Sequence, residues 1–274
     1  MNKPVKKIAL VANANKPAAR RIVQRAAKLS AAAGMTPVTD EAKAHLADLV
    51  MVFGGDGTML HWAREMADSG TPIFGVNIGG MGFLTAVSGK ELAKAIQAVA
   101  ARKFSIESRT LLTANGESNS KPFRLSAMND MVVSRGTVPR MIRVEVKVDG
   151  EVLTVYRCDG LVVSTPTGST AYSLAAGGAI MAPTAGVFSI TPVCPHTLSN
   201  RAVIVSQQSA IEVRMLDHQR EATLSADGSD VVTLGADSPV TIRRSRRKVK
   251  LARLPGSSFF QTLRQKLQWT GSHA

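Results

Sequence analysis

The chain has 274 residues, 45% of them hydrophobic, and a formal net charge of +14 at pH 7. This length allows two packed domains, and the composition is ordinary for a globular protein. Because no apolar run is long enough to span a bilayer and no signal-peptide pattern precedes the first apolar segment, we expect a cytoplasmic protein. The positive charge favours anionic partners such as nucleotides, nucleic acids or membrane surfaces, and it does not choose among them.

The two cysteines, Cys158 and Cys194, are too few for a disulfide framework and lack the spacing of metal ligands. We expect both thiols to be buried and reduced. No cluster of acidic residues or histidines has ligand spacing either, so we expect no permanent metal site in the chain.

Residues 5–104 alternate between strand-like and helical patterns. Apolar runs predict strands at 7–12, 49–53 and 71–77, and helical spacing predicts helices at 18–33, 59–66 and 90–102. Such alternation is typical of a doubly wound parallel sheet. We therefore expect an α/β nucleotide-binding domain over residues 1–110.

The sequence Gly-Gly-Asp-Gly-Thr at residues 54–58 follows the second expected strand directly and precedes a helix. Such a turn lies where a helix N-terminus and backbone amides can face a bound anion, and its glycines leave the main chain open to phosphate. Asp56 would repel that phosphate unless a cation lies between them or the carboxylate accepts a proton from an attacking hydroxyl, so it indicates catalysis. The alternative is a tight turn in which Asp56 caps the next helix.

A second glycine-rich segment, Asn-Ile-Gly-Gly-Met-Gly-Phe-Leu at residues 77–84, follows the next expected strand. Parallel strands of one sheet end at the same edge, so we expect this segment and the 54–58 turn to line a shared crevice. It matches neither the dinucleotide fingerprint nor a phosphate loop with Gly-Lys-Ser/Thr. A connection shaped only for packing is the alternative.

After residue 105 the apolar pattern changes to a period of two. Alternating segments at 142–148 and 151–156 flank Asp149-Gly150, which predicts a hairpin, and further alternation occurs at 202–206, 210–215 and 240–251. The polar stretch 115–120 predicts a loop near the domain boundary. We expect an antiparallel β-rich, sandwich-like domain over residues 111–255.

The last segment, residues 259–269, returns to helical spacing and carries apolar residues that need a surface to cover. We expect a C-terminal helix, within residues 256–274, that docks back onto the N-terminal domain.

Residues 159–178 form a third segment that indicates a ligand site. A strand at 161–164 leads into a stretch rich in Ser and Thr, stiffened by Pro166, and then into Ala-rich backbone that can begin a helix. Hydroxyls and exposed amides suit the hydroxyl and carbonyl groups of a ribose or an amide, so we expect residues 170–173 to form a contact surface. A turn rich in Ser and Thr is the alternative.

In their order and spacing these three segments, together with Asn129-Asp130, resemble the bacterial NAD kinase family. The similarity covers nearly the whole chain, including residues 224–228 and 258–264. The third segment is highly specific, whereas Gly-Gly-Asp-Gly-Thr also occurs in diacylglycerol, sphingosine and phosphofructo-kinases. One departure is Asp130, where family members often carry Glu; the shorter side chain keeps the charge and moves it by about one methylene.

The resemblance implies an enzyme that transfers the γ-phosphate of ATP to the adenosine 2′-hydroxyl of NAD, making NADP, with Mg²⁺ or another divalent metal bound to ATP. Asp56 matches the family's proton acceptor, and family precedent implies a homo-oligomer, a dimer or a tetramer, in which some arginines reach a neighbouring subunit. The implied NAD-binding residues are Asp56, Gly57, His61, Asn129, Asp130, Arg140, Arg157, Asp159, Thr170, Ala171, Tyr172, Ser173, Leu174 and Ala175, and the implied phosphate-loop backbone is that of Gly54, Gly55 and Thr58.

Two other classes of function remain open. A lipid kinase of the diacylglycerol kinase-like class would use the same glycine turn, and it leaves the hydroxyl-rich residues 165–173 unexplained. A nucleic-acid binder or nucleotide sensor would use the basic run 243–250, but that run lacks interleaved aromatic residues, and Asp56 counts against this function. We therefore expect small-molecule substrates and neither nucleic acid nor membrane as a partner.

Overall fold

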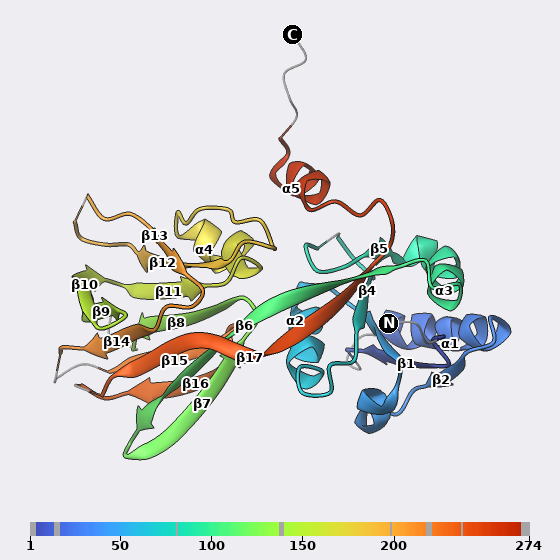
Figure 1. Cartoon of the computed structure of the whole chain (residues 1–274), viewed down its shortest axis with the longest axis horizontal. Coiled ribbons are helices and arrows are strands. Elements are labelled where there is room, and N and C mark those ends of the chain that lie inside the picture. Colours follow the sequence, from blue (N-terminus) through green and yellow to red (C-terminus); the bar gives the residue numbers. More distant parts are fainter. Residues whose placement is uncertain are drawn as a thin grey trace, which may run out of the picture. The chain divides into compact units, whose positions relative to one another are not determined.

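The computed structural model describes residues 4–13, 17–80, 82–136, 140–197, 199–217, 221–236 and 238–269 (Figure 1). The chain divides into two compact units. The first unit combines Met1–Ser108 with Lys248–Ala274, and the second consists of Arg109–Arg247. The C-terminal segment therefore belongs to the same unit as the N-terminal residues.

The first unit is built on a parallel sheet, as the alternation of patterns predicts. Its strands run in the order β2 (Thr36–Val38), β1 (Lys7–Ala12), β3 (Leu49–Phe53) and β4 (Ile73–Asn77). The short strand β5 (Val87–Ser88) and the end of β17 (Val240–Arg253) both pair with β4 in parallel orientation. Its helical segments are α1 (Pro17–Ala32), η1 (Glu41–Leu46), α2 (Asp56–Glu65), η2 (Gly89–Glu91), α3 (Leu92–Ala100) and α5 (Phe259–Leu267).

Helices cover both faces of this sheet. Every residue of β3 and β4 is buried, as expected for central strands with two covered faces. Met51 and Phe53 share one hydrophobic core with residues of α1 and α3. The intervening residues, Val50 and Val52, face the other side, and α2 packs against β3 and β4. The doubly wound arrangement is therefore confirmed.

The second unit is an antiparallel β-sandwich with a short helical insertion. One sheet contains β10 (Glu151–Cys158), β9 (Ile142–Val148), β14 (Ile211–Met215) and part of β17, together with β6 (Ser105–Ser118) and β7 (Lys121–Ala127). The other runs in the order β13 (Val203–Ser206), β12 (Val187–Val193), β11 (Gly160–Ser164), β8 (Asp130–Arg135), β15 (Ala222–Ala226) and β16 (Ser229–Leu234). The insertion consists of η3 (Gly168–Thr170) and α4 (Tyr172–Ala175).

The two faces of the β13–β16 sheet differ in chemistry. Met131, Val133 and Phe188 point into the core that this sheet shares with the β9–β14 sheet. Many of the alternate positions carry hydroxyl groups, among them Ser134 and Thr223, whose Oγ and Oγ1 atoms lie 3.0 Å apart on neighbouring strands. The apolar face therefore builds the sandwich, and the hydroxyl-rich face remains for the insertion and for a pocket.

The polar stretch at residues 115–120 is not the loop that its composition predicts. It lies at the end of the 14-residue strand β6, and Asn115 pairs with Arg124 of β7. The turn is confined to Asn119 and Ser120, which both have positive φ (50° and 58°). Two consecutive residues with positive φ are typical of a two-residue hairpin, whose exposed strands tolerate polar residues. The hairpin predicted at Asp149-Gly150 is confirmed, with φ values of 53° and 89°.

The C-terminal helix α5 is present as part of the first unit, where it contacts Phe83. The Ser258 side chain accepts a hydrogen bond from the amide of Gln261 and caps the helix N-terminus. Leu263 is buried, and the ring centroid of Phe259 lies 6.3 Å from that of Phe83. No helix in the described ranges is long and apolar enough to cross a membrane.

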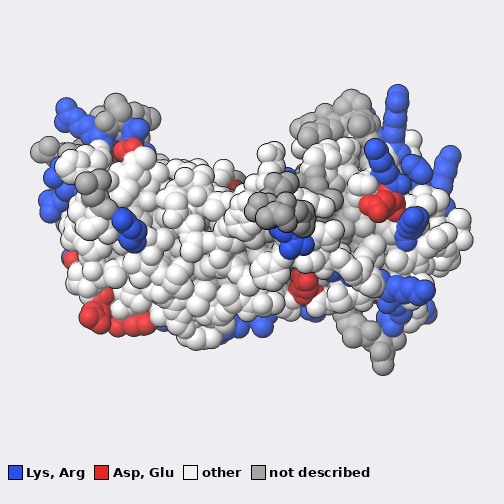
Figure 2. All heavy atoms as spheres, turned by 90° about the horizontal axis from the view of Figure 1, so that it is seen from above, with Lys and Arg blue, Asp and Glu red and all other residues white. Residues whose placement is uncertain are grey.

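The positive charge lies on the surface. Helix α1 exposes Arg20, Arg21, Arg25 and Lys28, and its sequence contains no acidic residue. Figure 2 shows more Lys and Arg side chains than Asp and Glu side chains on the face that it draws. Such a surface attracts anionic ligands over the distance of a Debye length.

The sandwich core yields a stability prediction. Phe188, the second residue of β12, is 0% exposed, whereas Ile204 on the neighbouring strand is 44% exposed. We expect Phe188→Ala to lower the free energy of unfolding by about 3–5 kcal/mol, because it leaves a cavity. The control Ile204→Ala should cost about 0.5 kcal/mol or less. Urea unfolding measures both, and equal effects would contradict the placement of the core.

Candidate functional site

Asp56 begins helix α2 and reaches across to the second glycine-rich segment. Its Oδ2 accepts a hydrogen bond from the amide of Phe83 at 2.9 Å, and its Oδ1 accepts one from the amide of Leu84 at 3.0 Å. The N-cap position is Gly55, which makes no side-chain cap. Asp56 is thus held by the loop over residues 77–84 and is not a helix cap, and the two segments predicted to share an edge of the sheet do meet there.

The Asn77 side chain holds the backbone of residues 79 and 80 in place. Asn77 is 4% exposed; its Oδ1 accepts a hydrogen bond from the amide of Gly79 at 2.6 Å, and its Nδ2 donates to the carbonyl of Gly80. A Cβ atom on Gly82 would lie 2.0 Å from Asp56 Oδ1. Only glycine at position 82 therefore lets the loop approach the carboxylate.

The first turn of α2 presents open backbone. Gly55 and Gly57 are exposed, and a Cβ atom on either would have no neighbour within 4 Å. Thr58 instead packs over Gly54, where an added Cβ would lie 2.4 Å from its hydroxyl oxygen. A helix N-terminus with free amides favours an anion, so this turn can hold phosphate beside Asp56.

The structure does not bring His61 to the Asp56 carboxylate. Five residues along an α-helix turn the side chain by about 140°. His61 is exposed and lines a separate cavity of about 670 Å³ in the first unit, together with residues such as His45, Trp62 and Glu65.

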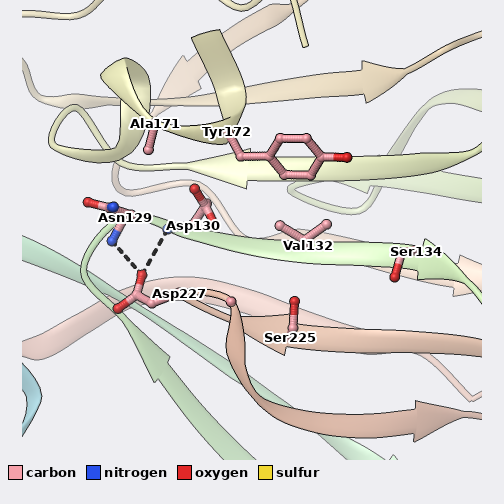
Figure 3. A pocket seen from close by; sticks show the side chains of 9 residues that line it. Asn129, Asp130, Val132, Ser134, Ala171, Tyr172, Ser225 and Asp227 are labelled. Carbon is pink, nitrogen blue, oxygen red and sulfur yellow. Dashed lines mark hydrogen bonds between the residues drawn. The ribbon is translucent and has the colours of Figure 1, made fainter. Parts of the chain in front are cut away.

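A second candidate pocket, of about 470 Å³, lies on the hydroxyl-rich face of the second unit (Figure 3). Figure 3 shows the Tyr172 ring extended over it, with Asn129 and Asp130 towards one end and Ser134 towards the other. The residues that line it are Asn129, Asp130, Val132, Ser134, Ala171, Tyr172, Ser225, Asp227 and Gly228. Four of these are predicted site residues, namely Asn129, Asp130, Ala171 and Tyr172.

Asp227 organises this pocket, although its sequence context does not predict that role. It lies in the β15–β16 hairpin with a φ of 51°. Its carboxylate accepts hydrogen bonds from the amides of Met128 at 2.9 Å, Asn129 at 2.7 Å and Asp130 at 3.2 Å. It therefore fixes the turn that presents the Asn129 and Asp130 side chains. The Asp-Gly dipeptide between two alternating segments is the signal that predicts its hairpin.

Most hydroxyls of the third segment serve the fold instead of lining the pocket. Thr165 Oγ1 donates to the carbonyl of Met128 at 2.6 Å, and Ser169 Oγ donates to the carbonyl of Pro166 at 2.7 Å. Ser173 is buried, with its hydroxyl 3.3 Å from that of Thr191. For these positions the turn rich in Ser and Thr describes the local structure, and the pocket receives Ala171 and Tyr172 from this segment.

The remaining predicted residues lie outside the pocket lining. Asp159 forms an ion pair with Arg135 at the far end of β8, with Nε and Oδ1 3.2 Å apart. Arg140 and Arg157 are exposed on the second unit. Thr170, Leu174 and Ala175 flank the two residues of the insertion that do line the pocket.

The Asp130 carboxyl group of this pocket has a shifted pKa. It is 4% exposed, and its pKa is raised from 3.8 to about 7, first by burial and then by the negative charge of Asp227. A carboxyl group with this pKa changes its charge near neutral pH. Such groups are typical of functional sites.

Neither cysteine belongs to the pocket lining, and no group of three or more His, Cys, Asp or Glu residues in the described part of the chain could hold a metal ion. Cys158 is buried, as expected, and burial raises the pKa of its thiol to about 11. The expectation is wrong for Cys194, which is exposed at a positive φ of 47° just after the end of β12.

Comparison with known proteins identifies the family. Residues 11–104 match the model of the ATP-NAD kinase N-terminal domain, and residues 128–254 match that of the ATP-NAD kinase C-terminal domain. An NAD kinase of Syntrophotalea carbinolica is 40% identical over 225 residues, which is 82% of this chain and 79% of that protein. An NAD kinase of Geobacter sulfurreducens is 34% identical over 281 residues, covering 97% of this chain and 99% of that protein.

Solved structures share the fold. A yeast NADH kinase in complex with NADH superposes with a TM-score of 0.84 at 24% identity, covering 100% of this chain and 90% of that one. An NAD kinase from Archaeoglobus fulgidus in complex with ATP gives a TM-score of 0.78 at 25% identity, covering 97% of this chain and 100% of that one. With two domain models matched and relatives aligned over most of their length, the chain belongs to the ATP-NAD kinase family.

Proposed function

We propose that this protein is an NAD kinase, which transfers the γ-phosphate of ATP to the 2′-hydroxyl of the adenosine ribose of NAD and makes NADP. The observation that carries the proposal is the Asp56 carboxylate, fixed by two amides beside an open helix N-terminus. Membership of the ATP-NAD kinase family supports it. The same membership disfavours a diacylglycerol kinase-like activity.

Asp56 accepts the proton of the attacking hydroxyl. As the 2′-oxygen of the ribose forms its bond to the γ-phosphorus, its proton passes to Asp56 and the bond from the γ-phosphorus to the β–γ bridging oxygen breaks, which releases ADP. Each carboxylate oxygen has two lone pairs, and the hydrogen bonds from Phe83 and Leu84 use one on each oxygen. The carboxylate is therefore held in place and can still accept the proton.

The open turn at the start of α2 contacts phosphate. The backbone of Gly55 and Gly57 is exposed, and Gly54 and Thr58 pack together to shape the turn. When bound to the phosphate oxygens of ATP, Mg²⁺ or another divalent cation would keep several of its waters and would offset the charge on the transferred phosphoryl group.

The pocket of the second unit binds NAD. Its volume of about 470 Å³ is in the range of small-molecule sites. Tyr172, with 46% of its surface exposed, offers a ring face for stacking, and Asn129, Asp130, Ser134 and Ser225 offer polar groups that can orient the ligand. Along the adjoining strip we assign further contacts to Asp159, Thr170, Leu174 and Ala175, whereas Ser173 is fully buried and supports the turn from inside.

Exposed basic groups complete the proposed site. Arg140 and Arg157 are exposed and available to phosphate groups of the substrates, and they can also reach a neighbouring subunit of a homo-oligomer. An oligomer is supported by β10, an edge strand that exposes Val152 by 53% and Val155 by 41%. We place the enzyme in the cytoplasm, where its two free thiols remain reduced.

Asp56→Asn tests the proposed reaction. We expect kcat for NADP formation to fall about 10²–10⁴-fold, while the KM for NAD changes little, because the amide cannot accept the proton. The assay incubates the pure protein with NAD, ATP and Mg²⁺ and detects NADP with an NADP-dependent dehydrogenase. Glu65→Gln, at an exposed position of the same helix, is the matched control and should keep the wild-type rate. A normal turnover of Asp56→Asn would remove Asp56 from the mechanism.

Asp130 makes stability depend on pH. Its pKa is about 7 in the folded protein and 3.8 without the fold, so between these pH values the folded protein binds more protons than the unfolded chain. Stability therefore falls as pH rises from about 4 to about 7, by up to about 4 kcal/mol at 1.36 kcal/mol per pKa unit. Asp130→Asn should remove this dependence.

Urea unfolding of the wild type and of Asp130→Asn at several pH values measures this effect. The free energy of unfolding of Asp130→Asn, minus that of the wild type, should be largest at pH 8 and should decrease as the pH falls through 7. A difference that does not change with pH would show that Asp130 titrates normally.

A further inference from the structure

Arg253, the last residue of β17, binds the loop that holds Asp56. Its Nη2 donates a hydrogen bond to the carbonyl of Phe83 at 2.9 Å, and its Nη1 donates to the carbonyl of Thr85 at 3.0 Å. Its Nε lies 3.6 Å from Glu107 Oε2, and its side chain is 11% exposed. A guanidinium this deeply buried needs such partners, because an unpaired buried charge is costly.

One peptide group connects Arg253 to Asp56. The carbonyl of Phe83 and the amide N–H of Leu84 belong to the same planar peptide bond, in which they point in opposite directions. Arg253 binds the carbonyl end, and Asp56 Oδ1 accepts from the N–H end at 3.0 Å. Because the peptide is rigid, Arg253 also sets the direction of the Leu84 N–H group and of the hydrogen bond that it donates to Asp56. A charged donor at the carbonyl also polarises the amide and strengthens its N–H donor.

Other contacts keep the same stretch of loop in place. Phe83 is held at its amide by Asp56, at its carbonyl by Arg253 and at its ring by Phe259 of α5. The amide of Gly82 donates to Thr85 Oγ1 at 3.2 Å, and the carbonyl of Thr85 accepts from Arg253. The loop is thus fixed from the C-terminal segment of the chain, while its amides fix the carboxylate.

We propose that Arg253 is a positioning residue for phosphoryl transfer, which holds the peptide between Phe83 and Leu84 so that Asp56 is aligned with the attacking hydroxyl. This inference rests on the proposed function. Arg253 acts through the loop, whose carbonyls it binds. Its loss should lower the rate of the chemical step and leave NAD binding almost unchanged.

Kinetics of Arg253→Met, Arg253→Lys and Asp56→Asn test the inference. A misplacement of about 1 Å can cost 10²-fold in rate, so we expect Arg253→Met to lower kcat by about 10–100-fold with little change in the KM for NAD. Arg253→Lys should recover part of the rate, because one ammonium group can reach one of the two carbonyls. Arg246→Met, at an exposed position of the same strand, is the matched control and should keep the wild-type kcat.

The double variant Asp56→Asn with Arg253→Met separates positioning from a general structural defect. If Arg253 acts through the carboxylate, the double variant is as slow as Asp56→Asn alone, because the aligned group is already lost. A further loss of the same factor that Arg253→Met causes on its own would overturn the proposal. A wild-type kcat in Arg253→Met would also overturn it.

Hydrogen exchange gives a readout that does not need activity. We expect the amides of Phe83 and Leu84 to exchange faster in Arg253→Met than in the wild type and in Arg246→Met, measured residue by residue with NMR. If the wild type made no NADP, the proposed function would fail and this measurement would still decide whether Arg253 holds the loop. Unchanged protection would overturn the inference, and Arg253→Lys carries the same measurement if Arg253→Met does not fold.

Discussion

The hydrogen bonds from Phe83 and Leu84 to Asp56 are the interaction on which the first part of the proposed site depends. They join the turn after β3 to the loop after β4. The strands β3 and β4 are parallel neighbours in the sheet. A carboxylate at the start of a helix would otherwise be free to turn towards solvent, and the two amides fix its direction. The close approach requires glycine at position 82, and the direction of the amides depends on the loop that Arg253 holds.

The second unit uses the same physical device for a different purpose. Asp227 accepts three backbone amides of the turn before β8, as Asp56 accepts two of the loop after β4. Hydrogen bonds from amides to a carboxylate are strong, and they satisfy backbone donors that have no strand partner. Asp227 is committed to this structural task. Its charge nevertheless raises the pKa of the neighbouring Asp130 carboxyl group, so the device that shapes the pocket also tunes its chemistry.

Local patterns in the sequence predict the elements of this fold and the position of the glycine turn. Period-two and helical spacing depend only on neighbouring residues, so β3, α2 and the hairpin at Asp149-Gly150 could be predicted. The contacts that arrange the site join residues far apart in the chain. Arg253 is 168 residues from Thr85, and Asp227 is 97 residues from Asp130. No local pattern encodes such pairs, which is why both side chains escape a sequence analysis.

Composition does not predict a binding surface where the polar side chains of a segment point into the protein. The hydroxyls of Thr165, Ser169 and Ser173 resemble a ligand surface in the sequence, yet each finds a partner within the protein. A buried hydroxyl is stable only when it is hydrogen-bonded, so a segment rich in Ser and Thr can be an interior scaffold as readily as a binding strip. What distinguishes Ala171 and Tyr172 is their place on the turn and not their polarity. The buried hydroxyls of this segment therefore fix the course of the backbone, and that course places Ala171 and Tyr172 at the pocket.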